Sequence, residues 1–227
     1  MPADYARRMS LLLAEMRRNM DGVTAEAMYN AGVRGLLNYG VGIPAIRAIA
    51  RAEGRDHRFA KYLYRQQVRE LRMAAVSIAQ PECVTADELS FWLEGNPATE
   101  LLDELAMQLI SRTPADVLSA VIGDWLEHGD AAARYTAMMA LSRARGFDAD
   151  RALTAMYDSL SAFFDDVRMA HGAVTMAASI AAADGSKAAR IREISDMLIC
   201  LTSDVTRGIT PAARHFADEI EWMIQTA

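Results

Sequence analysis

An internal repeat constrains the fold of this chain more than any other feature of its sequence. Residues 71–76, 133–138 and 167–172 resemble one another, because each has Arg at its second position, a large side chain at the third and a small one at the fourth. Arg134 and Arg168 are 34 positions apart, and pairs of helical segments recur with a period near 35 residues. Such a period is typical of solenoids, in which each helix pair buries its apolar face against the next. The sequence therefore predicts an all-α solenoid of helix pairs, an α-α superhelix, forming one domain over residues 1–227.

Composition agrees with helix and not with sheet. The 227 residues include 14 Met and 6 Pro and are 52% hydrophobic, and Ala, Leu, Met, Glu and Arg lose least on entering a helix. Apolar periodicity and the placement of Pro and Gly predict helices over residues 3–20, 45–52, 86–93, 96–112, 114–125, 131–145, 150–163, 167–183 and 185–201, and from Thr24 and Pro211 onward. Thr24 and Thr113 are the expected N-caps of their helices. Trp125 and Trp222 fall on apolar faces and are expected in the core.

Several classes of site find no support in the sequence. Cys83 and Cys200 match no metal or redox spacing, so two packed thiols are expected. The glycine-rich connector over residues 35–44 lacks the pattern of a phosphate loop. The four histidines lie on separate segments, so neither a metal site nor a cofactor is expected: His57, His128, His171 and His215. No stretch approaches about 18 uninterrupted apolar residues and no signal peptide begins the chain, so a soluble cytoplasmic protein without membrane contact is expected.

Charge is segregated along the chain. The net charge is −6, but residues 45–72 carry eight basic and three acidic groups, which is +5, whereas residues 73–130 carry one basic and eleven acidic groups, which is −10. Steps of three and four residues place the basic side chains on helical faces: Arg47, Arg51, Arg55, Arg58, Lys61, Arg65, Arg69 and Arg72. Two interpretations remain open, a solvated surface and a surface that binds an anion such as the DNA backbone.

One carboxylate is singled out by the repeat. About one period before Arg134 the chain reaches Asp103, at a position of the inner helix where neighbouring repeats carry arginine. The same helix carries Glu100 and Glu104, which would repel phosphate if they faced DNA. If the protein performs chemistry, Asp103 is the expected catalytic residue.

The order of these segments resembles a known family. Gly40-Val41, Pro44 and Arg47 resemble the glycine-valine, proline and arginine pattern that opens the bacterial DNA alkylation repair proteins, the AlkD-like glycosylases built from HEAT-like repeats. Further along, 69–72, the helix with Asp103 and the segment 134–137 follow in that family's order. An aspartate at the turn followed by Arg and small residues, as at residues 130–134 and 166–168, is also typical of HEAT-like repeats.

The resemblance implies an activity. Members of that family grip double-stranded DNA on a concave basic face and cleave the glycosidic bond of cationic N-alkylated purines. By this resemblance Asp103 would stabilise positive charge on the sugar and position water. Phosphates would be held by Arg47, Arg51, Arg58, Lys61, Arg65, Arg69, Arg72, Arg134 and Arg168. The family carries Trp four residues before its aspartate, where this chain has Thr99, and active relatives tend to have Arg where Tyr135 follows Arg134. The alternative is therefore a non-catalytic helical scaffold that binds a protein or another polyanion.

Overall fold

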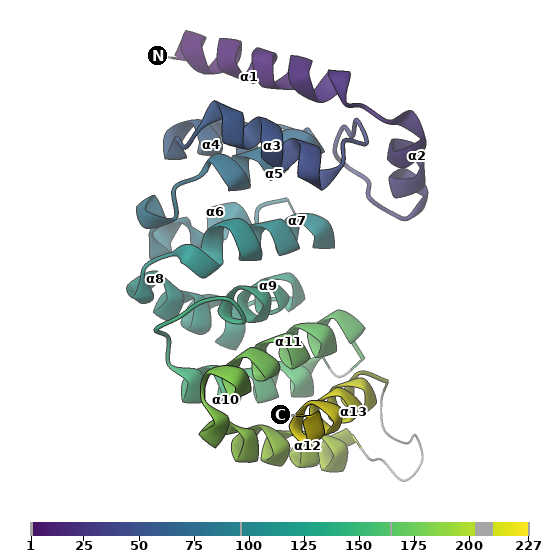
Figure 1. The fold of residues 1–227 in the computed structure, drawn as a ribbon, viewed down its shortest axis with the longest axis vertical. Helices are drawn as coiled ribbons and strands as arrows, with labels where there is room; N and C mark the ends of the chain where they lie inside the picture. Colours follow the sequence, from purple (N-terminus) through teal and green to yellow (C-terminus); the bar gives the residue numbers. More distant parts are fainter. Residues whose placement is uncertain (1, 96, 164, 203–210, 227) are drawn as a thin grey trace. The chain divides into compact units, whose positions relative to one another are not determined.

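The computed structural model describes residues 2–95, 97–163, 165–202 and 211–226, in which helices are joined by turns and short connectors (Figure 1). Within these ranges there is no strand, and an isolated parallel bridge joins Leu37 to Val68. The α-helices are α1 (Pro2–Arg18), α2 (Gly22–Asn30), α3 (Ile43–Glu53), α4 (His57–Tyr64), α5 (Arg69–Ile78), α6 (Leu89–Trp92), α7 (Thr99–Glu104), α8 (Ala115–Ala120), α9 (Ala131–Leu141), α10 (Ala149–Ala162), α11 (Val167–Ala183), α12 (Ala188–Thr202) and α13 (Pro211–Thr226). The predicted all-α class is confirmed.

Short segments of tighter or wider helix complete several of these elements. Two π-helical segments, η3 (Leu105–Leu109) and η5 (Val121–Glu127), extend α7 and α8. Short 3-10 segments are η1 (Pro81–Cys83), η2 (Ala86–Glu88), η4 (Ile110–Arg112) and η6 (Gly185–Lys187). The helices predicted over 96–112 and 114–125 are thus present but change their winding partway.

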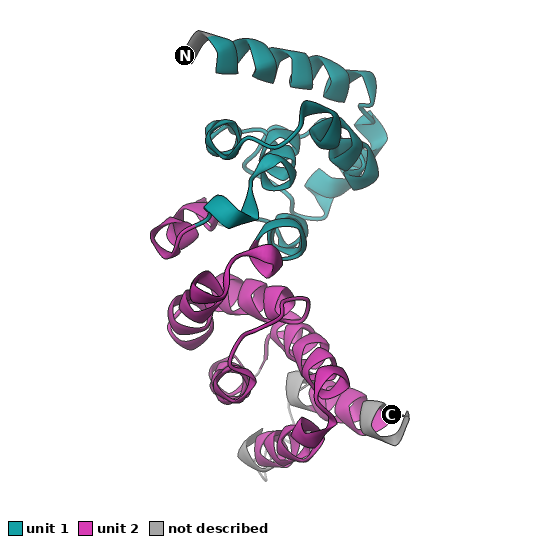
Figure 2. Cartoon of the chain, turned by 60° about the vertical axis from the view of Figure 1, so that its left-hand side comes forward, with its two compact units in different colours: residues 1–84, 97–109 teal, residues 85–96, 110–227 magenta. Residues whose placement is uncertain are grey.

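The chain divides into two compact units (Figure 2). Unit 1 contains Met1–Val84 and Pro97–Leu109, and unit 2 contains Thr85–Asn96 and Ile110–Ala227. Because the chain passes from one unit to the other at three points, neither unit is a single continuous segment. The single domain expected over residues 1–227 stays a prediction.

Unit 1 is built on α5. This helix is buried along almost its whole length, with Leu71, Met73 and Val76 at 1% exposure or less. Helices α3, α4 and α7 each pack against α5, and α1 packs against α3. Helix α3 begins with Pro44 in its first turn and ends at Gly54, whose φ of 86° suits glycine. Arg8 links α1 to the turn between α3 and α4, because its Nε lies 2.7 Å from Glu53 Oε1 and its Nη1 lies 2.7 Å from Asp56 Oδ2.

A buried carboxylate holds the glycine-rich connector of unit 1. Glu70 is fully buried, and its Oε1 accepts hydrogen bonds from the backbone N–H groups of Tyr39 at 3.1 Å and Val41 at 3.3 Å. Gly40, between them, has a φ of 71°, and a Cβ there would lie 2.0 Å from the carbonyl oxygen of Asp21. Only glycine fits at this crossing, so the connector packs directly on the start of α2.

Unit 2 repeats one construction. Helix α11 packs against both α9 and α13, while α10 packs against η5, α11 and α12. The starts of α9, α10, α11 and η6 are each capped by an aspartate that accepts a backbone N–H bond, and successive caps are 18 residues apart: Asp130, Asp148, Asp166 and Asp184. Two such intervals make one helix pair, which is the physical origin of the period near 35. The fold is that of a HEAT-like helical repeat.

Four local predictions were wrong. Asp21, not Thr24, caps α2, because its carboxylate accepts the N–H groups of Val23 and Thr24. The hydroxyl of Thr113 donates back to the carbonyl of Ile110 at 2.8 Å and does not cap α8.

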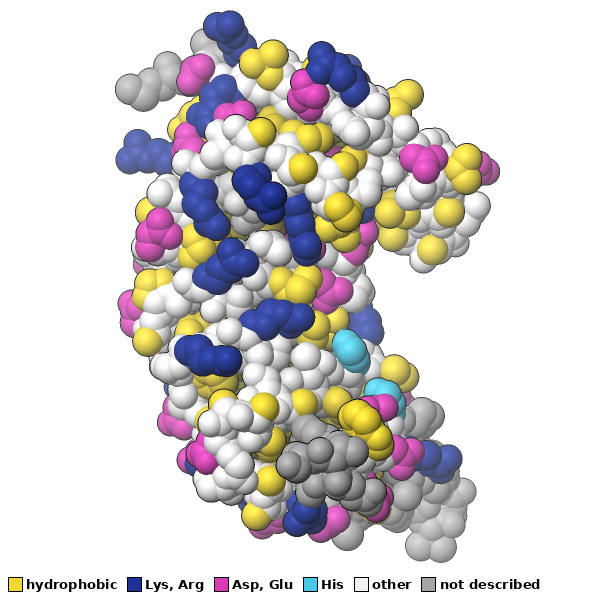
Figure 3. Space-filling model, viewed as in Figure 1, with side chains coloured by type: hydrophobic (Ala, Val, Ile, Leu, Met, Phe, Trp, Pro, Cys, Tyr) yellow, Lys and Arg dark blue, Asp and Glu magenta, His cyan; other side chains and the backbone are white. Residues whose placement is uncertain are grey.

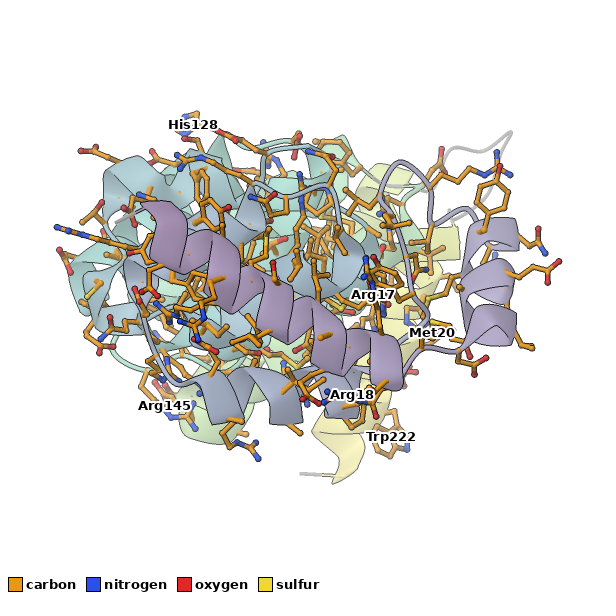
Figure 4. All side chains as sticks on the ribbon, turned by 90° about the horizontal axis from the view of Figure 1, so that it is seen from above. Arg17, Arg18, Met20, His128, Arg145 and Trp222 are labelled. Atoms are coloured by element: carbon orange, nitrogen blue, oxygen red, sulfur yellow. The ribbon has the colours of Figure 1, made fainter. Side chains whose placement is uncertain are left out.

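The other two corrections concern burial. Trp125 is buried at 3% exposure as expected, but Trp222 is 65% exposed and projects from α13 (Figure 4). Cys83 is an exposed free thiol and not a packed one, and the side chain of Cys200 lies outside the described residues. Apolar spacing identifies a helix face, but whether another helix covers that face is a tertiary property.

Candidate nucleic-acid interface and carboxylate

Helix α7 presents Asp103 at its second turn. Leu101 and Leu102 of α7 are buried, at 3% and 1% exposure, and anchor the helix in unit 1. The i,i+4 spacing puts Glu100 and Glu104 on one face and Thr99 and Asp103 on the adjoining one. Asp103 and Thr99 are both half-buried, so the predicted catalytic carboxylate lies at the edge of the packed interior.

Glu104 binds Arg47, the residue of α3 that was predicted to contact phosphate. The guanidinium of Arg47 donates two hydrogen bonds to Glu104, from Nε to Oε2 at 2.9 Å and from Nη2 to Oε1 at 2.5 Å. Glu104 is 2% exposed, and its bonds to Arg47 raise the pKa of the guanidinium further above its usual range. Arg47 therefore neutralises a buried acid, while its own side chain stays 36% exposed.

Glu100 binds Arg69, the first residue of α5. Arg69 donates from Nε and Nη2 to Glu100 at 2.5 and 2.8 Å, and from Nη1 to Glu70 at 3.0 Å. Burial alone would lower the pKa of Arg69, but the bonds and charges of the two glutamates raise it on balance. With 3% of its side chain exposed, Arg69 lies in the interior of unit 1 and not on a basic surface.

These bridges change how the acidity of α7 is interpreted. Glu100 and Glu104 do not present uncompensated charge, because each is paired with a guanidinium across 31 and 57 residues of sequence. The repulsion of phosphate expected from them is thereby reduced. Asp103 is partly exposed, as Glu100 is, and lies on the same helix as these two bridges.

The remaining basic residues of unit 1 fall into exposed and buried groups. Arg51 on α3, Arg58 on α4 and Arg65 after α4 are exposed, and Lys61 is half-exposed. Figure 3 shows Lys and Arg side chains gathered on one face of unit 1. The exposed cations come from two different helices, so the sequence stripe does not form a single helical face.

Arg72 belongs to the buried group. It is 5% exposed, its Nε donates to the carbonyl of Gln66 at 3.2 Å, and its guanidinium lies 5.3 Å from the ring centroid of Tyr64. Arg55 is exposed, but it also makes a structural contact, donating to the carbonyl of Ala79 at 2.7 Å. Both contacts hold turns of unit 1 in place.

In unit 2, Arg134 closes the end of η5. It donates to the carbonyls of Gly129 at 2.8 Å and Glu127 at 2.7 Å and to Ser159 Oγ at 3.0 Å. Its guanidinium also lies 5.6 Å from the ring centroid of Phe163. A cation at the carbonyl end of a helix is stabilising, so these contacts give Arg134 a clear structural role. Its role as a phosphate contact stays a prediction.

Arg168 lies beside the cap of its own helix. Its Nη2 is 3.2 Å from Asp166 Oδ2, and 53% of its side chain is exposed. Burial opposes ionisation of Asp166, but hydrogen bonds from Arg168 hold the pKa of the carboxyl below its usual value on balance. Arg168 thus retains access to solvent while it is paired within one repeat.

The structure unites some predicted residues and separates others. It places Arg47, Arg69 and the helix of Asp103 together in unit 1, whereas Arg134 and Arg168 belong to unit 2. Sequence reasoning missed Glu70, although a signal existed. Seven of the eight residues from Leu71 to Ile78 are buried, and an acid that opens such a mostly apolar helix has to bury its charge against a donor. The described residues contain no group of three or more potential metal ligands, and none of their helices is long and apolar enough to cross a membrane.

Stacked helix pairs with aspartate caps and internal Arg–Glu bridges define a HEAT-like helical-repeat protein. Residues 12–189 match the sequence model of the family described as DNA alkylation repair enzyme, and the chain belongs to that family. A solved structure described as "A new family of proteins related to the HEAT-like repeat DNA glycosylases with affinity for branched DNA structures" has the same fold, with a TM-score of 0.70 at 14% identity over 96% of this chain and 94% of that one. No match was found among curated proteins.

Proposed function

We propose that this protein binds double-stranded DNA through the exposed cations of unit 1, as part of DNA alkylation repair. The observation that carries the proposal is the distribution of charge around α3, α4 and α7. The glutamates of α7 are neutralised internally by Arg47 and Arg69, while Arg51 and Arg58 remain exposed. Membership of the DNA alkylation repair family supports a DNA ligand.

The test is a DNA titration at several salt concentrations. Each phosphate contact adds about 0.9 to the slope of log affinity against log salt concentration for B-form DNA. Arg58→Gln should therefore weaken binding and lower this slope by about one. Arg190→Gln, which removes an arginine of α12 in unit 2 whose side chain is 41% exposed, is the control and should leave both unchanged. Absence of binding to duplex DNA at low salt would overturn the proposal and favour a scaffold for a protein or another polyanion.

DNA shape is part of the same titration. The relative of similar fold is described as having affinity for branched DNA structures, so a four-way junction is compared with a duplex of the same total length. If the exposed cations of α3 and α4 make the contacts, Arg51→Gln and Arg58→Gln reduce the affinity for both substrates.

A second function, hydrolysis of the N-glycosidic bond of cationic alkylpurines, is favoured by the position of Asp103. A cationic base is a good leaving group, so the protein has to stabilise the positive charge that develops on the sugar, and a fixed carboxylate does this. Asp103 is half-buried and borders the neutralised Glu100 and Glu104. Thr99 stands where the family has an aromatic residue, so any base release depends on the carboxylate without that aromatic contact.

The test uses DNA that contains N-methylated purines. Wild-type protein should release the methylated base, and Asp103→Asn should slow release by about 100-fold or more if the carboxylate stabilises the transition state. DNA affinity should change little, because Asp103 is not one of the cations. Release that is absent in wild type, or equal in the variant, contradicts a catalytic Asp103 and leaves DNA binding to be judged by the salt titration.

A further inference from the structure

An acidic cleft lies within unit 2, and its lining includes none of the residues discussed above as DNA contacts. It has a volume of about 580 Å³ and is formed by η2, α6, η5 and the start of α9. Its lining is Ala86, Asp87, Leu89, Ser90, Leu93, Glu94, Asp124, Trp125, Gly129, Asp130 and Ala133. Four of these residues are acidic and none is basic.

The rim of the cleft carries exposed negative charge. Asp87, Asp124 and Asp130 are exposed, and Asp130 uses one carboxylate oxygen to accept the N–H of Ala133 at 2.9 Å. No ion pair involves Asp87 or Asp124 in the part of the chain that the structure describes. His128, which follows η5 and immediately precedes the lining residue Gly129, is exposed and projects outward (Figure 4).

The floor of the same cleft is apolar. Leu89 and Trp125 are buried at 2% and 3% exposure, and Leu93 is half-buried. Elsewhere in unit 2 acids pair with cations, as Glu127 does with Arg151 at 2.6 Å. Asp87 and Asp124 form no such pair within the described residues, so the repulsion between like charges at the cleft is reduced when a positively charged partner binds there.

We infer that the cleft docks a lysine- or arginine-rich segment of a partner protein that also carries an apolar side chain. The carboxylate rim complements the basic groups, and the floor of Leu89, Leu93 and Trp125 receives the apolar one. DNA is a poor occupant, because its phosphates would face the carboxylates. The interaction is therefore separate from the proposed DNA contacts.

The experiment measures binding of labelled synthetic peptides by fluorescence anisotropy. A peptide of alternating lysine and leucine is compared with lysine–serine and glutamate–leucine peptides of equal length. The lysine–leucine peptide should bind most tightly, and Asp87→Asn combined with Asp124→Asn should weaken it about tenfold. The control, Asp116→Asn with Asp158→Asn, changes the net charge equally at exposed positions outside the cleft and should change affinity less than about twofold.

Leu93→Ser tests the floor and should remove the preference for the lysine–leucine peptide over the lysine–serine one. Affinity that falls equally in the cleft and control variants overturns the inference, as does equal binding of the two lysine peptides. Self-association that is lost in the cleft variant would place a second copy of the chain there and also overturn it. DNA affinity of the cleft variant should match wild type, so the outcome is independent of the proposed DNA binding.

Discussion

The two units treat the same kind of residue in opposite ways. In unit 1 the carboxylates of Glu70, Glu100 and Glu104 lie against Arg69 or Arg47, at 2.5 to 3.0 Å. In the cleft of unit 2, Asp87 and Asp124 line a surface with no basic residue. Four of these five residues lie in the acidic stretch 73–130, and Glu70 lies just before it. The sequence alone does not distinguish the paired carboxylates from the others.

The difference shows that charge in this chain has two structural uses. A buried carboxylate costs free energy unless it is paired, so the glutamates of unit 1 are tied to the fold and their removal should destabilise it. An exposed carboxylate among others contributes little to stability and remains available to a partner. Substitutions in the two regions should therefore change the free energy of unfolding by amounts that differ in sign as well as in size.

The largest effect is expected at the interior bridge. Arg69→Met leaves Glu70 and Glu100 without their guanidinium, and breaking a buried pair by removing one partner costs about 3–5 kcal/mol of unfolding free energy. Urea denaturation measures this. Arg51→Met, at an exposed position of α3, is the control and should stay within about 0.5 kcal/mol of wild type. Equal stability of the two variants would remove the distinction between structural and surface cations in unit 1.

A smaller effect is expected at Glu104→Gln, with an opposite effect on DNA binding. Because the side chain of Arg47 is 36% exposed, loss of its charge-assisted bonds to Glu104 should lower the free energy of unfolding by about 1–3 kcal/mol. The guanidinium, released from the acid, becomes available to a phosphate, so DNA affinity at low salt should rise. Urea denaturation and a DNA titration on the same preparation test both. A variant that loses stability and DNA affinity together would mean that the bridge positions the DNA contacts.

A titratable contribution is expected at Asp56, which binds Arg8 and accepts the N–H of Phe59 as the cap of α4. Burial opposes its ionisation, but the bonds from Arg8 and the backbone outweigh this and lower the pKa of the folded carboxyl below its usual value. Its stabilising contribution is therefore complete above the unfolded pKa of about 4 and is lost as the pH falls through the folded pKa.

Asp56→Asn keeps a capping side chain and removes the charge, so it should cost about 0.5–1 kcal/mol at pH 7. That difference from wild type should shrink as the pH falls below about 4. Urea midpoints measured across this range provide the comparison. A difference that persists unchanged at low pH would show that the effect of Asp56 is not electrostatic.

The smallest stability effect is expected in the cleft. Asp87→Asn with Asp124→Asn should leave the unfolding free energy within about 0.5 kcal/mol of wild type or raise it slightly, since two exposed like charges are removed. Thermal unfolding at low and moderate salt measures this, and any gain should fade as salt increases. A loss above that range would mean that these carboxylates hold the fold, as those of unit 1 do.

Most of the fold was readable from the sequence because it depends on local signals. Helix α11 begins and ends at the predicted residues, and Pro44 and Pro211 lie in the first turns of helices as expected. The repeat was detectable through Arg134 and Arg168, although the aspartate caps at intervals of 18 residues are its more regular sign.

The candidate site was less predictable. Exposure of a cation depends on what packs over it, and the same three- and four-residue spacing includes buried Arg69 and exposed Arg65. Trp125 and Trp222 have similar apolar neighbours in sequence but opposite burial, for the same reason. Whether Asp103 and the exposed cations act on DNA stays a prediction for the titrations above.

The sequence by itself determined the helices, their repeat and the family, because helix periodicity, capping residues and turn residues act over a few positions. Only the tertiary structure decided that Arg47 and Arg69 reach Glu104 and Glu100, across 57 and 31 residues, while Asp87 and Asp124 form no ion pair with any described residue. The physical reason is that the free energy of a charge depends on its burial and its partner, and both are set by which helices pack together.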